Sequence, residues 1–189
     1  LLDAKYKGQI ALAGDPRASN QAAQSVYAAA LANGGTLDNT GDTLTLNAGT
    51  GTWHLDGGTV SGGTLAFADG KRLLIWSNPA NRLTGVTVDG DLDLSEDYAC
   101  VKIEGGTTFA NAHLSGNYSA LGFAPGQTLT GNILLEGSGA AQRYVGMNGT
   151  SGTLTIGPTG SIRAVAGFGG TGYVGNGHYF SGTMTLVNQ

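Results

Sequence analysis

The chain has 189 residues, of which 34 are glycine and four are proline, a glycine content more than twice the average of about 7%. Collagen is excluded because glycine does not occupy every third position, and disorder is excluded because 40% of the residues are hydrophobic and only 12% are charged. A net charge of −4 with scattered basic residues argues against nucleic-acid binding.

The first 38 residues are rich in alanine and differ from the remainder. Residues 9–13 predict a short strand, and residues 16–33 predict a helix. Asp15 can cap the N-terminus of this helix, Pro16 suits its first position, and Asn33 with Gly34 can end it. We therefore expect residues 1–38 to form a strand and a capping α-helix that precede the main domain.

Residues 39–189 change to a period of two, which is typical of half-buried strands. Short glycine-rich stretches separate these segments and indicate tight corners. Alternating polar and apolar residues predict strands at Thr43–Leu46, Thr52–Leu55, Thr64–Phe67, Val86–Asp89, Asp91–Leu94, Val101–Glu104, Thr153–Ile156 and Thr183–Leu186.

The strand segments also resemble one another. Gly-Gly-Thr recurs at Gly34, Gly57, Gly62 and Gly105, and the loose repeat of roughly 20–30 residues is typical of a solenoid. We expect an all-β fold, a single-stranded parallel β-helix with one capping helix. A β-sandwich and an up-and-down barrel are the rival architectures, but Asn-Gly and Asp-Gly turns rarely join two matching strands here.

One polar patch is the best candidate for chemistry. If Val86, Val88, Leu92 and Leu94 point inward, then Thr87, Asp89, Asp91 and Asp93 point outward. The same alternation turns Cys100, Lys102 and Glu104 outward on the next segment, with Arg82 nearby. The weak candidates for catalytic residues are therefore Asp91, Asp93, Lys102 and Glu104.

Two interpretations of this patch stay open. Polysaccharide lyases and hydrolases built on β-helices use outward carboxylates with Ca²⁺ or with an Arg or Lys base, which would make this chain an enzyme acting on an ester or a polysaccharide. The alternative, which we favour, is a solvated face whose charge pairs each contribute less than about 1 kcal/mol. We expect no cofactor, and Ca²⁺ is the only ion to consider.

Other potential sites have little support. His54, His113 and His178 show no metal-ligand spacing, so we expect ordinary surface or corner histidines. No serine lies in a Gly-x-Ser-x-Gly elbow. The glycine-rich residues 167–177 resemble phosphate-binding loops, but no helix is predicted to follow them.

Two resemblances extend these predictions. The segments Gly57–Leu65, Leu83–Leu92 and Gly152–Gly157 resemble autotransporter-associated and filamentous-haemagglutinin-like β-helix repeats of bacterial surface proteins, a likeness covering about residues 42–189. It implies an extracellular or cell-surface location and a structural or adhesive role. Residues 1–35 are similar to a strand and helix of the solute-binding proteins of ABC importers. That likeness implies a fused fragment, and an ordinary helical cap is the alternative.

The remaining expectations concern the ends of the chain and its partners. No apolar run is long enough to span a membrane, and the single Cys100 cannot form an internal disulfide. The chain begins with Leu1 and Leu2, which suggests a processed or excised piece. The segment Thr183–Gln189 predicts an uncapped last coil, so we expect it to pair with a second copy of the chain. Glycans are the other expected partners, because of the adhesive role.

Overall fold

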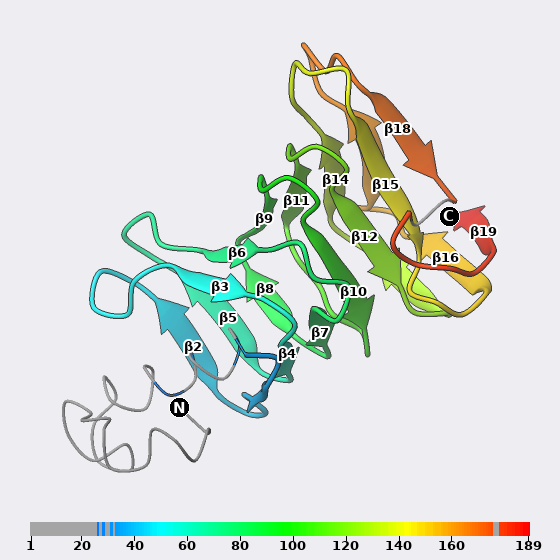
Figure 1. Ribbon diagram of the computed structural model, residues 1–189. Helices are drawn as coiled ribbons and strands as arrows, with labels where there is room; N and C mark the ends of the chain where they lie inside the picture. The colour runs from blue at the N-terminus through cyan, green and yellow to red at the C-terminus, as the bar shows by residue number, and fades with distance from the viewer. Residues whose placement is uncertain (1–25, 27, 29–30, 32, 176–177) are drawn as a thin grey trace.

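The computed structural model is a parallel β-solenoid, and it describes residues 26, 28, 31, 33–175 and 178–189 (Figure 1). Every named strand pairs only with parallel neighbours from the turn before or after it. The sandwich and the barrel, which need antiparallel pairing, are therefore excluded. Strands at equivalent positions in successive turns lie next to one another, and each such stack forms one side of the solenoid.

Sheet A is the longest side. It contains seven strands in the order β1 (Thr36–Asp38), β4 (Thr59–Ser61), β7 (Arg82–Thr84), β10 (Cys100–Glu104), β12 (Ala120–Phe123), β15 (Gln142–Met147) and β18 (Thr171–Val174). Sheet C contains six, in the order β3 (Trp53–Leu55), β6 (Leu73–Ile75), β9 (Asp91–Leu94), β11 (Asn111–Leu114), β14 (Asn132–Leu135) and β17 (Ser161–Ala164).

Two short sheets make up the third side, between sheets A and C along the chain. Sheet B holds β2 (Thr43–Leu46), β5 (Thr64–Phe67) and β8 (Thr87–Asp89), and sheet D holds β13 (Gln127–Leu129), β16 (Gly152–Ile156) and β19 (Met184–Asn188). The turn between the two sheets contributes only an isolated bridge, from Thr87 to Thr108.

Glycine permits the sharp corner between sheets A and B. Gly62 and Gly63, which alone separate β4 from β5, have φ values of 69° and 66°. A Cβ on Gly63 would lie 1.9 Å from the carbonyl oxygen of Asn39 on the preceding turn. At this corner, both the backbone angle and the close approach of the preceding turn require glycine.

The core fills the inside of the solenoid with stacked apolar side chains. In sheet C, Leu92 and Leu94 stack on Ala112 and Leu114, and all four are fully buried. Val86 and Val88 are buried as well, so the predicted inward and outward faces around β8 and β9 are confirmed. Alternation in the sequence therefore sets which side chains reach the core.

All eight segments predicted as strands are strands, with boundaries that differ by at most two residues. The prediction missed short strands that do alternate, such as β4 and β11, and also strands that do not alternate. In β12, all four residues are buried, since both faces of this strand are covered. In β15, five of the six residues are buried for the same reason.

The N-terminal predictions lie mostly outside the described residues. The strand at residues 9–13 falls there entirely, and so does most of the helix predicted at residues 16–33. Of that segment, Leu31 is described and is fully buried in the core. A Cβ on Gly58 would come within 2.6 Å of the Leu31 carbonyl oxygen, so this end of the segment packs closely on the turn that contains β4.

Apolar side chains lie open on the strands nearest the C-terminus. Val174 pairs with the buried Val145 and Leu186 with the buried Leu154, so both occupy core positions, yet they are 46% and 44% exposed. Self-association at this end stays a prediction. Within the residues that the structure describes, no helix combines the length and the apolar character that crossing a bilayer requires.

Candidate functional site

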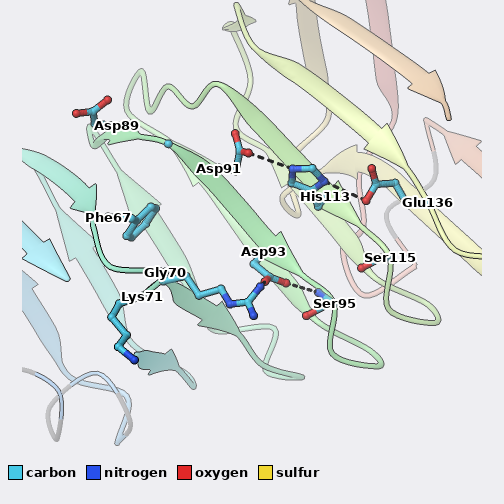
Figure 2. A pocket seen from close by; sticks show the side chains of 12 residues that line it. Phe67, Gly70, Lys71, Asp89, Asp91, Asp93, Ser95, His113, Ser115 and Glu136 are labelled. Carbon is cyan, nitrogen blue, oxygen red and sulfur yellow. Dashed lines mark hydrogen bonds and ion pairs between the residues drawn. The ribbon is translucent and has the colours of Figure 1, made fainter. Parts of the chain in front are cut away.

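An open groove of about 630 Å³ runs over the outer face of sheet C (Figure 2). Its walls come from the ends of β5 and β8, from the loop before β6, and from residues on or just after β9, β11 and β14. The lining residues are Phe67, Gly70, Lys71, Arg72, Asp89, Gly90, Asp91, Asp93, Ser95, His113, Ser115 and Glu136.

Parallel stacking explains why these polar side chains gather. Asp93 pairs in register with Leu74 on one neighbour and with His113 on the other, so its side chain stands on the same outer face as theirs. Asp91 pairs with Asn111 in the same way. Residues about one turn apart in sequence thus become neighbours in space, which no local motif reveals.

Arg72 and Asp93 form the tightest ion pair of the groove. Arg72 Nη1 donates to Asp93 Oδ2 over 2.5 Å, and the backbone N–H of Ser95 donates to Asp93 Oδ1 over 2.9 Å. The Asp93 side chain is only 13% exposed, and both of its oxygens have partners. Asp93 therefore holds the Arg72 side chain across the groove, and these two hydrogen bonds already occupy both oxygens of its carboxylate.

His113 lies between two carboxylates. Its Nε2 is 3.2 Å from Asp91 Oδ2, and its Nδ1 is 3.0 Å from Glu136 Oε2, as the dashed lines in Figure 2 show. Burial lowers the pKa of His113, but hydrogen bonds to Glu136 and Asp91 raise it by more, so the net shift is upward. The imidazolium form can donate to both acids, whereas a neutral ring can donate to only one.

A row of hydrogen-bonded side chains leads away from the groove along sheet C. Asn111 Nδ2 donates to Asp91 Oδ1, Asn132 Nδ2 donates to Asn111 Oδ1, and Ser161 Oγ donates to Asn132 Oδ1, over 2.8, 3.1 and 2.8 Å. The row crosses four neighbouring strands and ends on a groove carboxylate. It engages Asp91 Oδ1, while His113, on the same strand as Asn111, engages Oδ2.

Arg143 supports the groove from behind. This arginine is 1% exposed and donates only to backbone oxygens: Nε to Leu114 and Glu136, Nη1 to Gln142, and Nη2 to Ser115. Burial lowers the pKa of its guanidinium. Because these carbonyls follow β11 and β14, Arg143 ties the corner after sheet C to β15 of sheet A and holds the backbone that carries Ser115 and Glu136.

The four residues predicted from the sequence do not form one site. Asp91 and Asp93 line the groove, but Lys102 and Glu104 stand on β10 in sheet A, on a different side of the solenoid. Glu104 pairs there with Arg82 at 3.3 Å and accepts a hydrogen bond from Asn148 Nδ2 at 2.7 Å. The strands are consecutive in sequence, but the chain turns a corner between them.

A covering segment, residues 178–182, lies over the outside of sheet A; in Figure 1 it belongs to the connection between β18 and β19. Phe180 packs with Cys100, Ala120 and Tyr144, and the Lys102 Nζ lies 5.6 Å from the centroid of its ring. Cys100 points outward as predicted, yet it is fully buried, and burial raises the pKa of its thiol to about 12. Its thiol is therefore inert in this state.

Aromatic rings extend this covered area. Tyr98 and Tyr118 stack at 5.3 Å, and the His178 ring stacks on Tyr118 and Tyr144 at 5.6 and 4.6 Å. Tyr98 and Tyr118 both have left-handed backbone angles, φ 64° and 59°, at matching places in successive turns. We call these rings together the aromatic cluster; its members are Tyr98, Tyr118, Tyr144, Tyr173, His178, Tyr179 and Phe180.

Sequence reasoning missed His113, Glu136 and Arg72. His113 was expected to be an ordinary surface histidine, whereas the structure places it between Asp91 and Glu136. The one usable sign was the distance along the chain, since His113 follows Asp93 by the same interval that separates Asn111 from Asp91. Among the described residues, no three His, Cys, Asp or Glu side chains are arranged to hold a metal ion together.

The groove combines groups that recognise polyhydroxylated molecules. Carboxylates accept hydrogen bonds from hydroxyl groups, Lys71 can donate them, and the Phe67 ring offers an apolar surface.

No protein-family model, curated protein or solved structure shows a significant match to this chain.

Proposed function

We propose that the chain is a structural or adhesive solenoid of a secreted or cell-surface bacterial protein, and that it binds glycans in the groove on sheet C. The groove itself carries this proposal, because the outer surface is hollowed there and lined by hydrogen-bonding groups together with an aromatic ring. The bacterial surface location rests on the resemblance of residues 42–189 to autotransporter-associated and haemagglutinin-like repeats.

Charge selects the kind of glycan. The groove holds four carboxylates, Asp89, Asp91, Asp93 and Glu136, against the cations Lys71 and Arg72 and the titratable His113. Arg72 is already paired with Asp93. The surplus of negative charge disfavours uronic acids and favours neutral or amino sugars, whose hydroxyl and ammonium groups donate to carboxylates.

A binding experiment tests the proposal. Calorimetry or a glycan array with neutral oligosaccharides should show binding to the wild type. Asp91→Asn combined with Glu136→Gln should weaken it at least about tenfold, because each change replaces a charged carboxylate, the stronger acceptor, by a neutral amide with only one acceptor oxygen. Glu104→Gln, a change of the same kind on sheet A, is the matched control and should bind as the wild type does. Equal affinities for the groove variant and the control would overturn the proposal.

The arrangement around His113 favours hydrolysis as a second candidate function. Two carboxyl groups separated by an imidazole lie in an open groove, and paired carboxyl groups serve as acid and base or nucleophile in glycoside hydrolases. Release of reducing ends from an oligosaccharide by the wild type, and its loss in folded Glu136→Gln, would support this function. Binding without any release would leave the protein a binding module.

A further inference from the structure

An exposed tryptophan lies on the same sheet as the groove. Trp76 immediately follows β6, where Leu73 and Ile75 are buried and Leu74 points outward. Alternation therefore puts Trp76 on the outer face with Leu74, whose in-register partner on β9 is Asp93. Trp76 is 42% exposed, so indole surface lies open on the outer face of the sheet that carries the groove.

Hydrogen bonds fix the backbone of Trp76, and one neighbouring ring contacts its indole. The Trp76 N–H donates to the Leu55 carbonyl over 3.1 Å, and the Trp76 carbonyl accepts from Asn78 N, Asn81 Nδ2 and Cys100 N over 2.9, 2.9 and 3.3 Å. The His54 ring meets the indole edge-on, at 4.6 Å and 75°. A platform fixed in this way loses little conformational entropy when a ligand stacks on it.

We infer that Trp76 is the stacking platform for a neutral pyranose ring of a glycan whose adjoining units occupy the groove. The C–H groups on one face of a pyranose pack on an indole face, while the hydroxyl groups at its rim reach donors and acceptors beside it. This inference rests on the proposed glycan binding and adds to it the residue that selects sugars with an apolar face. Exposure of a rigid Trp beside hydrogen-bonding groups is typical of residues that dominate binding energy.

Intrinsic fluorescence provides a direct test, because the chain has two tryptophans and Trp53 is buried. Titration of the wild type with cellohexaose should shift the emission of Trp76. In Trp76→Phe, only Trp53 remains, so this shift should vanish while calorimetry still detects binding. Trp76→Ala should bind at least about tenfold more weakly than the wild type.

Tyr98→Ala is the matched control, because Tyr98 is the other exposed large aromatic residue among those described and belongs to the aromatic cluster. It should bind cellohexaose as the wild type does. If Asp91→Asn with Glu136→Gln weakens binding but Trp76→Ala does not, the role of Trp76 is refuted and glycan binding stands. If the wild type binds neither cellohexaose nor chitohexaose, the proposed function fails and this inference fails with it.

Discussion

Inward and outward side chains alternate in the same way on sheet A and sheet C, but the outer face of sheet C is open and that of sheet A is covered. On sheet C, the outward Asp91 and His113 line an open groove. On sheet A, the outward Cys100 is fully buried beneath the aromatic cluster. The comparison teaches that strand alternation decides which way a side chain points, but a segment from elsewhere in the chain decides whether it meets water.

A single glycine makes the covered face possible. Gly122 on β12 lies directly beneath Phe180, and a Cβ at this position would come within 2.5 Å of the Phe180 ring. On the open face, by contrast, the Asp91 side chain remains 47% exposed. The difference between the two faces therefore depends on the Phe180 ring, which can pack against β12 because Gly122 has no side chain.

The largest effect is expected from removing this fit. Phe180→Ala should lower the free energy of unfolding by about 3 kcal/mol, the usual loss for a buried aromatic side chain. It should also open the face of sheet A, so that Cys100 reacts with a disulfide reagent at pH 8. Chemical denaturation and the rate of thiol labelling measure the two effects.

Two further variants separate the fit from a general loss of stability. Gly122→Ala should also expose Cys100, by displacing the ring, at a cost of about 1–3 kcal/mol. Val187→Ala, on an exposed side chain of β19, should change neither quantity. Labelling of Cys100 that stays slow in both Phe180→Ala and Gly122→Ala would show that something other than this segment buries the thiol.

A smaller change should strengthen the cover. The Tyr179 hydroxyl is buried without a hydrogen-bond partner, and burial raises the pKa of this phenol to about 12. Tyr179→Phe removes the unsatisfied group and keeps the ring, so we expect a gain of about 1 kcal/mol in the free energy of unfolding. Thiol labelling of Cys100 should slow further. A loss of stability would mean that the hydroxyl has a partner, such as a buried water.

The smallest effect concerns the open face and depends on pH. The folded-state pKa of His113 is raised, so its stabilising contribution is present below the unfolded pKa of about 6.5 and is lost as pH rises through the folded value. The stability difference between the wild type and His113→Gln should therefore be larger at pH 5.5 than at pH 8.5. We expect less than about 1 kcal/mol, because the ring is partly exposed.

Urea denaturation at the two pH values measures this difference. Asp91→Asn combined with Glu136→Gln removes both partners of His113, so in that background the pH dependence of His113→Gln should disappear. A difference that instead grows towards pH 8.5 would contradict the assigned protonation of the ring.

The fold was predictable because its rules are local. Alternation in segments such as Asp91–Leu94 and the recurring Gly-Gly-Thr corner were enough to predict stacked parallel strands. Strands such as β12 were not predicted because residues 178–182 cover their outer side, so that buried and exposed residues do not alternate along them. That cover depends on contacts across more than two turns, which no pattern within one turn can show.

The site was predictable only in part. Asp91 and Asp93 were found because two outward carboxylates on one strand are visible in the sequence. Lys102 and Glu104 could have joined them only if the two strands shared a face, and the sequence does not show that the corner at residues 95–99 turns the chain from sheet C to sheet A. His113 and Glu136 were missed because their partners lie one or two turns away, and the register that aligns them depends on the lengths of the intervening loops.

The hydrogen-bonded row on sheet C also shows how such a molecule can change over evolutionary time. Its links span 20 residues from Asp91 to Asn111, 21 from Asn111 to Asn132 and 29 from Asn132 to Ser161, yet the side chains still meet. The additional residues of the longer turn are accommodated outside the stacked positions of the row. Insertions and deletions at corners therefore hardly disturb the stacking of the strands. Whole turns can be duplicated, lengthened or exchanged during evolution, and the outer surface of each added turn can then acquire a function of its own.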